Sequence, residues 1–385
     1  MSDPAAPSPL DRYQRQMLLP AIGAAGQARL LDAHALIVGC GALGCAIADA
    51  LARGGVGQLT IVDRDVVELT NLQRQVLFDE ADAASGVPKA AAAKARLQQI
   101  NSGIEIEARV SDFNARNAEA LSRGADIILD GLDNFETRYL LNDLAVARGL
   151  PYIYGGAVAT TGLSMAILPH GAQRRPPTSR AGDRATAVTW SDEQATPCLR
   201  CVFPEAPPAG TSPTCDTAGV LGGAVQAVAA HQATQAIKML SGNLDAIDRR
   251  LFSIDVWSNS CSMFDVAAAR SPECPCCGLG RFDFLAGSTG SATTALCGRQ
   301  AVQISPGTES EPSAHRLDLG EMASRLAPHG SFARTPYLLR GTLRHERSRA
   351  GQPIELTLFP DGRAVIKGTS EPDEARAIYA RYVGN

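Results

Sequence analysis

The residues best suited to chemistry lie between Ile37 and Arg74. A strand-like apolar run ends at Val38, and a glycine-rich loop follows it. Such a loop lets the backbone approach a phosphate at the start of a helix. Its members are Gly39, Gly41, Ala42, Leu43 and Gly44. Asp63 ends the next strand-like run, where an acid binds ribose hydroxyls in dinucleotide folds. Alone, this pattern is typical of a dehydrogenase.

A polar cluster after the second strand changes that interpretation. The run Asn-Leu-Gln-Arg-Gln contains Asn71, Arg74 and Gln75. A hydride-transfer site does not need an arginine and an asparagine directed at phosphates, so we expect the phosphates themselves to react. No Gly-Lys-Ser/Thr sequence follows the glycine loop, which disfavours a P-loop kinase or ATPase.

Two Cys-x-x-Cys pairs provide the second signal. The pairs are Cys198 with Cys201 and Cys274 with Cys277, and Cys276 is an alternative to Cys277. Four thiolates in two such knuckles are typical of a closed, structural Zn²⁺ site. Chance clustering or a redox pair is the alternative. A closed site would connect distant segments without doing chemistry.

The remaining cysteines have different expected roles. Cys215 lies in a polar, glycine-rich turn before a helix, where proximity to the helix N-terminus would lower the pKa of its thiol. An ordinary loop cysteine is the alternative. We expect the other four to be small core residues, namely Cys40, Cys45, Cys261 and Cys297.

Composition limits the partners and the compartment. The 385-residue chain is 45% hydrophobic and has a formal net charge of -4, which argues against nucleic acid or an anionic membrane as partner. The sequence has neither a signal-peptide pattern nor an apolar run long enough for a membrane span, so we expect a cytoplasmic protein. Ten cysteines in that compartment favour metal binding or thiol chemistry over disulfides.

Strand and helix patterns alternate from residue 34 to about residue 170. This alternation predicts an α/β fold with a doubly wound, Rossmann-like, mostly parallel sheet. We expect helices at 89–100, 117–123, 136–148 and 222–240, and strands at 104–109, 127–129 and 152–155. Residues 1–30 are expected to form an amphipathic helical lead-in, and residues 171–197 an exposed loop.

The pattern predicts two domains. Residues 1–285 form the main domain with the cysteine pairs, and Ser/Thr/Gly/Pro-rich residues 286–315 form a linker. Residues 316–385 form a small α+β domain to which we assign no role. Its expected strands are 354–359 and 364–367, followed by a helix over 372–382.

The order of these motifs resembles one family, the sulfur-carrier protein adenylyltransferases of molybdopterin and thiamine biosynthesis, relatives of the ubiquitin-activating enzymes. The resemblance covers about residues 10–283. Besides the glycine loop and the paired cysteines, it rests on segments 12–16, 63–65, 71–75, 88–89 and 130–134.

The resemblance implies an activity. The C-terminal glycine carboxylate of a ubiquitin-like sulfur carrier attacks the α-phosphate of ATP, and pyrophosphate leaves. Such a reaction between anions needs charge neutralisation and alignment. By resemblance, Lys89 and Arg74 hold phosphate oxygens, Asp63 holds the ribose and Asn71 orients the phosphate chain. Gln75 completes this part of the nucleotide site.

The resemblance also implies a Mg²⁺ ion and a second subunit. Asp133, followed by Asn134, would hold Mg²⁺, with Asp65 and Asp130 in support. Arg15 would reach the partner subunit's site, so a homodimer is expected. The alternatives are surface positions for Arg15 and Arg74, a solvated Lys89 at a helix start, and Asp133 as a helix N-cap.

Some features limit the resemblance. No Cys-Arg-x-Gly-x-Arg sulfurtransferase loop is present, so a separate sulfurtransferase is expected to supply sulfur. Cys215 matches a position where thiamine-branch relatives bond covalently to the carrier. The pathway stays open. An NAD-dependent oxidoreductase and a non-catalytic adaptor for a ubiquitin-like partner are the competing functions.

Overall fold

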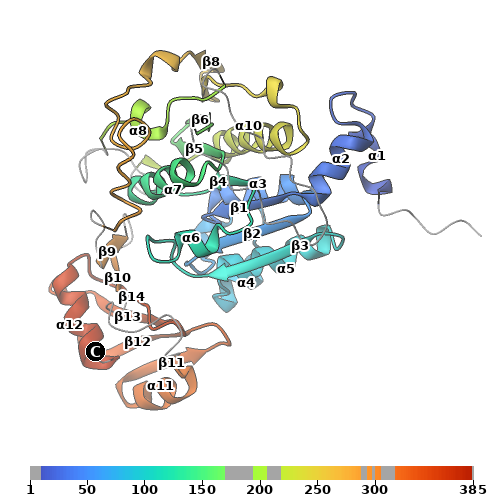
Figure 1. The fold of residues 1–385 in the computed structure, drawn as a ribbon. Coiled ribbons are helices and arrows are strands. Elements are labelled where there is room, and N and C mark those ends of the chain that lie inside the picture. The colour runs from blue at the N-terminus through green and yellow to red at the C-terminus, as the bar shows by residue number, and fades with distance from the viewer. Residues whose placement is uncertain are drawn as a thin grey trace, which may run out of the picture. The chain divides into compact units, whose positions relative to one another are not determined.

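A computed structural model describes residues 10–169, 194–205, 218–287, 293–296, 300–304 and 317–383. The chain divides into two compact units, Met1–Thr289 and Gly290–Asn385 (Figure 1). Cys215, Cys297 and most of the loop expected at 171–197 lie outside the described residues. Among the described helices, none is both long and apolar enough to cross a membrane.

The first unit contains an eight-stranded sheet in the order β3-β2-β1-β4-β5-β6-β7-β8. Strands β1 to β5 pair in parallel, and β6 to β8 are antiparallel. The strands are β1 (His34–Val38), β2 (Gln58–Asp63), β3 (Glu105–Val110), β4 (Ile127–Asp130), β5 (Tyr152–Val158), β6 (Thr161–Ile167), β7 (Leu251–Asp255) and β8 (Ser260–Phe264). The predicted fold class, a mostly parallel doubly wound sheet, is confirmed.

Helices cover both faces of this sheet. Alternate residues of β1 enter two different apolar clusters: Ile37 packs with α3 and α10 residues, and Leu36 with α7 residues. All five β1 residues are buried, as expected for a central parallel strand. The main helices are α2 (Gly23–Asp32), α3 (Ala42–Gly54), α5 (Lys89–Ile100), α7 (Phe135–Arg148) and α10 (Gly222–Leu240). The shorter ones are α1 (Gln14–Met17), α4 (Glu80–Ser85), α6 (Ala118–Leu121) and α8 (Leu199–Val202).

The helical lead-in is interrupted. Within residues 10–32 the structure has two α-helices, α1 and α2, separated by a turn at 18–22. Pro20 lies in this turn, and Gly23 has a φ of 57°. Proline lacks a backbone donor and glycine adopts positive φ freely, so the turn divides the amphipathic pattern.

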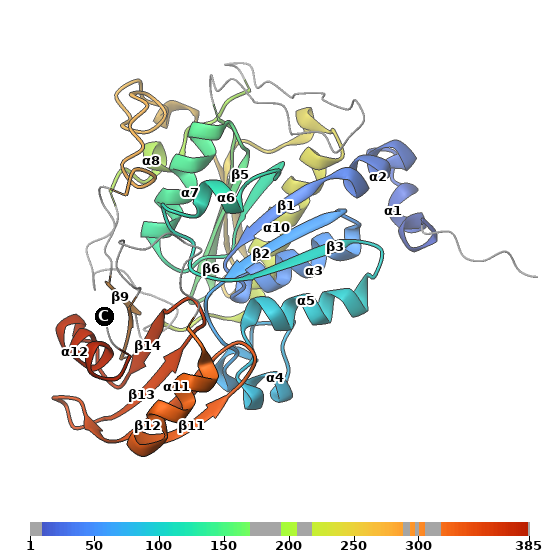
Figure 2. The same cartoon turned by 60° about the horizontal axis from the view of Figure 1, so that its bottom comes forward.

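The second unit contains a six-stranded antiparallel sheet in the order β11-β12-β13-β14-β10-β9 (Figure 2). Its apolar core includes residues of α11 (Leu319–Leu326) and α12 (Pro372–Tyr382). The strands are β9 (Thr293–Leu296), β10 (Ala301–Ile304), β11 (Gly330–Arg334), β12 (Leu339–Arg347), β13 (Pro353–Leu358) and β14 (Ala364–Lys367).

The expected linker at 286–315 is therefore wrong in part. Both β9 and β10 fall inside it, and β10 pairs with β14. Each strand has only four residues and lies between polar, glycine-containing segments. β9 pairs with β10, and β10 joins the sheet through β14, more than fifty residues further along the chain, so local composition gave no sign of this sheet.

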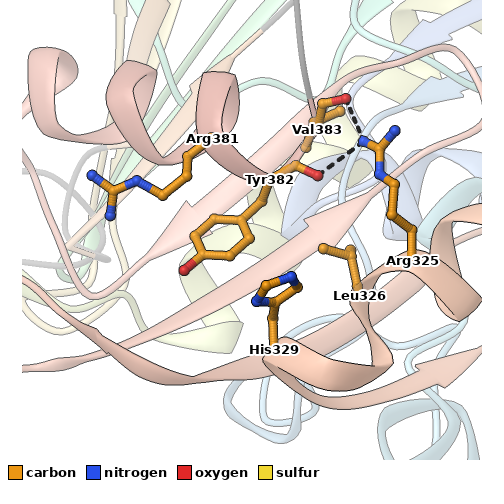
Figure 3. A pocket seen from close by; sticks show the side chains of 6 residues that line it. All are labelled: Arg325, Leu326, His329, Arg381, Tyr382 and Val383. Atoms are coloured by element: carbon orange, nitrogen blue, oxygen red, sulfur yellow. Dashed lines mark hydrogen bonds between the residues drawn. The ribbon is translucent and has the colours of Figure 1, made fainter.

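The second unit also contains a shallow pocket next to the end of α12. Its lining residues, shown in Figure 3, are Arg325, Leu326, His329, Arg381, Tyr382 and Val383. Arg325 donates to the carbonyls of Tyr382 and Val383 at 3.0 and 2.6 Å. Arg381 pairs with Glu346. Both guanidinium groups are therefore already paired with other groups of the second unit, and we assign the pocket no chemistry.

His231 gives the first unit an acid-sensitive contact. Its ring stacks on Phe252 at 4.4 Å between centroids. Burial lowers the pKa of His231 from 6.5 to about 4. Between pH 4 and pH 6.5 the unfolded chain binds more protons at His231 than the folded chain does. The neutral imidazole therefore contributes fully to stability above about pH 6.5, and its contribution is lost as the pH falls toward 4.

Replacing His231 by Phe should therefore reduce the acid sensitivity. Wild type should lose about 1–2 kcal/mol more unfolding free energy than His231→Phe between pH 7 and pH 4.5, after allowance for partial exposure. Denaturant unfolding at both pH values measures this, and groups common to both proteins cancel in the difference. Equal losses would contradict the assignment.

Candidate functional site

The glycine loop packs tightly against the loop that follows β4. Gly39 has a φ of 87°, and a Cβ added there would lie 2.6 Å from the carbonyl oxygen of Gly131. A Cβ on Gly44 would lie 1.9 Å from the Gly39 oxygen. No side chain caps the start of α3. The first N–H groups of α3 are therefore available to an anion.

Asp63 connects β2 to the glycine loop. Its two carboxylate oxygens accept hydrogen bonds from the backbone N–H groups of Cys40 and Asp65 at 2.6 and 2.7 Å. Burial raises the pKa of Asp63, and the charge of Lys89 and these N–H groups oppose that rise. The predicted ribose-binding acid thus lies beside the glycine loop.

Lys89 is buried at the start of α5. Lys89 is 3% exposed, and its Nζ lies 3.2 Å from Asp65 Oδ2. The alternative of a solvated lysine at a helix start is therefore wrong. Burying an ammonium group costs free energy unless an anion of the protein or of a ligand pairs with it.

Arg64 is a site residue that the sequence analysis missed. Its Nη1 lies 3.0 Å from Asp112 Oδ1, and its Nε lies 3.9 Å from Asp65 Oδ1. Burial lowers the pKa of Arg64, but the surrounding carboxylates, including Asp133, raise it overall. The sequence signal that could have identified Arg64 is its place between two acidic residues, in the run Asp-Arg-Asp at 63–65. Arg64 shares the Asp65 carboxylate with Lys89.

The amides of Asn71 and Gln75 are buried with unused polar atoms. The two residues are 0% and 3% exposed. Asn71 Oδ1 accepts from the Glu68 N–H at 3.0 Å. Within the described part of the chain, Asn71 Nδ2 and Gln75 Oε1 have no hydrogen-bond partner. An unsatisfied buried amide costs about 1–3 kcal/mol, so such atoms indicate a ligand that pairs with them.

Arg74 is partly exposed within the same segment. Its Nη1 donates to the Thr70 carbonyl at 2.9 Å. Among the described residues, the Arg74 side chain makes no hydrogen bond or ion pair with the glycine loop. The structure thus places Arg74 in the segment of Asn71 and Gln75, with its role in phosphate binding still a prediction.

Asp133 is exposed, and its neighbour Asn134 performs the capping. Asn134 Oδ1 accepts from the Thr137 N–H at 2.9 Å, which caps α7. The idea that Asp133 is the N-cap is therefore wrong. The Gly131 N–H donates to the Val38 carbonyl at 2.8 Å, which holds this loop beside the glycine loop. The Asp133 carboxylate remains available to a ligand.

Arg15 lies at the other end of α3 from the glycine loop. It is exposed in α1, where the adjacent Gln16 donates to the carbonyl of Gly54, the last residue of α3. A helix of 13 residues is about 20 Å long. Arg15 is therefore not brought together with the other predicted residues of its own chain.

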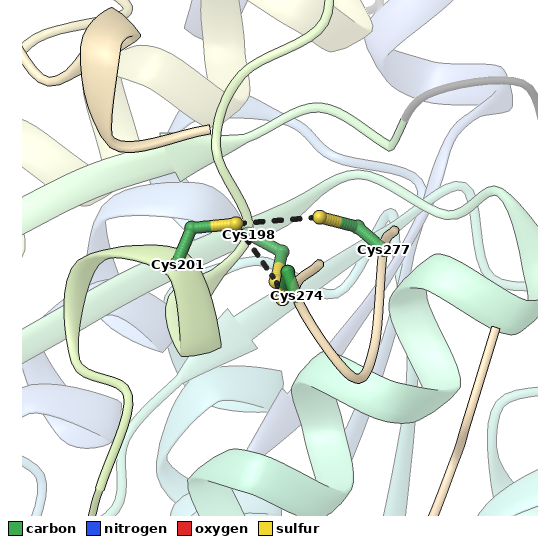
Figure 4. Close-up of side chains that lie close together, drawn as sticks. All are labelled: Cys198, Cys201, Cys274 and Cys277. Carbon is green, nitrogen blue, oxygen red and sulfur yellow. Dashed lines mark hydrogen bonds between the residues drawn. The ribbon is translucent and has the colours of Figure 1, made fainter. Parts of the chain in front are cut away.

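The four predicted zinc ligands converge (Figure 4). The sulfurs of Cys198, Cys201, Cys274 and Cys277 all lie within 4.8 Å of one another. The sulfurs of Cys198 and Cys274 lie 3.6 Å apart, and those of Cys201 and Cys277 lie 3.3 Å apart. Tetrahedral Zn²⁺ with Zn–S bonds of about 2.3 Å requires sulfurs about 3.8 Å apart, so the cluster fits that ion.

Cys276 is outside the cluster. It is 0% exposed, and its Sγ accepts from Asn142 Nδ2 at 3.2 Å. Cys40 and Cys45 are buried, as predicted. Cys261 is exposed, so its assignment to the core is wrong. It lies in β8, the edge strand, in which all five residues are exposed.

A model of the ThiF family matches residues 13–276. The chain belongs to the ThiF family. The sulfur carrier protein ThiS adenylyltransferase of Bacillus subtilis is 39% identical over 374 residues, covering 97% of this chain and 99% of that relative. The adenylyltransferase and sulfurtransferase MOCS3 of Sus scrofa is 32% identical over 381 residues, covering 95% and 76%.

A solved structure, the microcin C7 biosynthetic enzyme MccB in complex with N-formylated MccA, has a TM-score of 0.56. It is 24% identical and covers 70% of this chain and 75% of that one, so it supports the fold alone. With the relatives above, the family establishes that this ThiF-family protein is an adenylyltransferase that uses ATP. The oxidoreductase and adaptor alternatives are set aside.

Proposed function

We propose that the protein adenylylates the C-terminal glycine of a ubiquitin-like sulfur-carrier protein. The observation that carries the proposal is that, among the described residues, the buried atoms Asn71 Nδ2 and Gln75 Oε1 have no hydrogen-bond partner, in the segment that follows β2 and Asp63. Buried Lys89 supplies a positive charge for the triphosphate of ATP, and exposed Asp133 supplies a carboxylate for the cation that accompanies ATP. The full-length relative named a ThiS adenylyltransferase supports the choice of substrate.

Each residue has a role in binding ATP. The phosphates lie at the start of α3, where close glycine packing leaves the backbone exposed to them. Lys89 exchanges part of its contact with Asp65 for a phosphate oxygen, while Arg64 keeps Asp65 neutralised. Asp63 binds the ribose. Asn71, Gln75 and Arg74 orient the phosphate chain.

The reaction is a displacement at the α-phosphorus. One oxygen of the carrier carboxylate forms a bond to this phosphorus, the bond to the bridging oxygen breaks, and pyrophosphate leaves. The carrier ends as an acyl-adenylate. The protein contributes alignment and charge neutralisation, because both reactants are anionic.

Asp133 fits a site for Mg²⁺. The ion prefers one or two carboxylates together with phosphates and water, and Asp133 offers an exposed carboxylate near the glycine loop. When bound, Mg²⁺ supplies positive charge that favours departure of pyrophosphate. Because Asn134 caps α7, the carboxylate of Asp133 is not used as a cap and would hold the ion.

We propose that the active form is a homodimer. Arg15 cannot serve its own glycine loop, because α3 separates the two. Leu18 and Leu19, which follow it, are 72% and 54% exposed. A second copy that covers these leucines would carry Arg15 to the partner's nucleotide.

The carrier is proposed to dock at the β7–β8 edge. Trp257, Met263 and Phe264 are 77%, 37% and 52% exposed there. Several large apolar side chains on one edge are typical of a protein interface. We further propose a separate sulfurtransferase as sulfur donor, a structural Zn²⁺ at the cysteine cluster and a cytoplasmic location.

Carrier-dependent exchange between ATP and labelled pyrophosphate tests this function. The protein is incubated with ATP, Mg²⁺ and one carrier at a time, of the thiamine or of the molybdopterin type. We expect exchange with one type only, which also assigns the pathway. The absence of exchange with both types, in a protein that binds ATP, would refute the proposed substrate.

Cys215→Ala should leave the exchange intact. Cys215 lies outside the described residues, but the proposed adenylylation uses no thiol. Exchange should stay within about twofold of wild type, whereas a covalent carrier adduct detected by non-reducing electrophoresis should disappear. Complete loss of exchange would contradict this division of roles.

A further inference from the structure

A buried ion pair lies directly beneath the loop that carries Asp133. Arg138 Nε lies 3.2 Å from Asp130 Oδ2, and the two side chains are 7% and 0% exposed. The Tyr152 hydroxyl donates to the same carboxylate oxygen at 2.6 Å. Such a pair gains little net stability over apolar residues, because both charges lose their hydration. Its position therefore suggests a purpose beyond stability.

The pair fixes the residue that precedes Asp133 from both sides. The Leu132 N–H donates to Asp130 Oδ1 at 2.9 Å, and the Leu132 carbonyl accepts from Arg138 Nη2 at 2.7 Å. Asp130 thus binds the amide of Leu132, and Arg138 binds its carbonyl. The geometry leaves the chain little freedom at the point where Asp133 begins.

Arg138 also connects this loop to β5. Its Nη2 donates to the Gly155 carbonyl at 2.9 Å. The guanidinium carbon lies 5.5 Å from the ring centroid of Phe135 and 5.4 Å from that of Tyr154. Two rings and two carbonyls therefore restrict the guanidinium to one orientation. A planar fork of donors can make these contacts together, and a lysine ammonium cannot.

We propose that Arg138, Asp130 and Tyr152 act as one positioning unit that sets the place of the Asp133 carboxylate for a divalent cation. All three residues are buried, so they act through the loop that carries Asp133 and are positioning residues. The inference rests on the proposed function in that Asp133 holds the ion accompanying ATP. Residues that orient a metal ligand commonly change metal affinity about 10–100-fold when replaced.

Mn²⁺ binding in the presence of a non-hydrolysable ATP analogue tests the proposal without any carrier. Free Mn²⁺ is followed by electron paramagnetic resonance in wild type, Arg138→Lys and Tyr152→Phe. We expect Mn²⁺ affinity to fall about tenfold or more in Arg138→Lys and about threefold in Tyr152→Phe. Affinity for the metal-free analogue should stay within about twofold in both variants, because the unit does not contact the nucleotide.

Arg148→Lys is the matched control, since Arg148 ends the same helix and pairs with Glu119 on the surface. It should bind Mn²⁺ as wild type does. If Arg138→Lys does not fold by circular dichroism, Tyr152→Phe still decides, because it removes one hydroxyl and keeps the ring. Unchanged Mn²⁺ affinity in the folded variants, or an equal loss of metal-free analogue binding, would overturn the proposal. Failure of carrier adenylylation in wild type would leave this result standing and refute the proposed function alone.

Discussion

Asp133→Asn is expected to reduce carrier-dependent pyrophosphate exchange about 10²–10³-fold, with the melting temperature unchanged. The side chain is exposed, and its described hydrogen bond is a 3.4 Å contact from Asn134 Nδ2. Removing its charge should therefore leave the fold intact while it removes the carboxylate proposed to hold Mg²⁺. Initial rates across a Mg²⁺ titration measure the effect, and more Mg²⁺ should restore part of the rate.

Glu136→Gln provides the control for charge. Glu136 is an exposed acid in the first turn of α7, three residues after Asp133. Its replacement removes the same charge from the same end of the helix, and exchange should stay within about twofold, because charge effects at a helix end are small. Equal losses of exchange rate in the two variants would show that Asp133 acts only through the long-range effect of its charge and not by binding Mg²⁺.

Cys274→Ser is expected to abolish stoichiometric zinc and to lower the unfolding free energy of the first unit by about 5 kcal/mol or more. The four sulfurs join two distant segments, and their spacing suits one tetrahedral ion. Losing one thiolate opens the site and frees the segments that it connects. Zinc content by elemental analysis and denaturant unfolding measure the two effects.

Two cysteines serve as controls for the zinc site. Cys276→Ser should keep one zinc per chain, because its sulfur accepts from Asn142 and lies outside the cluster. Cys261→Ser, at an exposed edge position, should change neither zinc content nor stability. Loss of zinc in Cys276→Ser with retention in Cys277→Ser would reverse the assignment of the fourth ligand.

The parallel part of the main sheet, β1 to β5, was predictable because its strands carry local signals, whereas the antiparallel strands β6, β7 and β8 were not among the expected strands. Buried central strands such as β1 are continuous apolar runs, and helices α5 and α10 have the predicted bounds. The glycine loop and the cysteine pairs were visible because glycine and cysteine have few alternative roles at such spacing. These features depend on neighbouring residues alone.

The missed features depend on contacts between distant residues. Strands β9 and β10 are defined by pairing within the second sheet, not by their own composition. The positioning role of Arg138 arises from carbonyls in two different segments. The choice of Asn134 over Asp133 as cap depends on one residue of helix boundary, which sequence patterns do not resolve.

Transfer of label from ATP to the carrier tests the central claim most directly. The protein, Mg²⁺ and the carrier active in exchange are incubated with ATP labelled at either the α- or the γ-phosphate, and the carrier is isolated at once under acid conditions. The account predicts α-label on the carrier, none when its terminal glycine is deleted, and γ-label in pyrophosphate alone. Gamma-label on the carrier, or α-label that persists without the glycine, would contradict it.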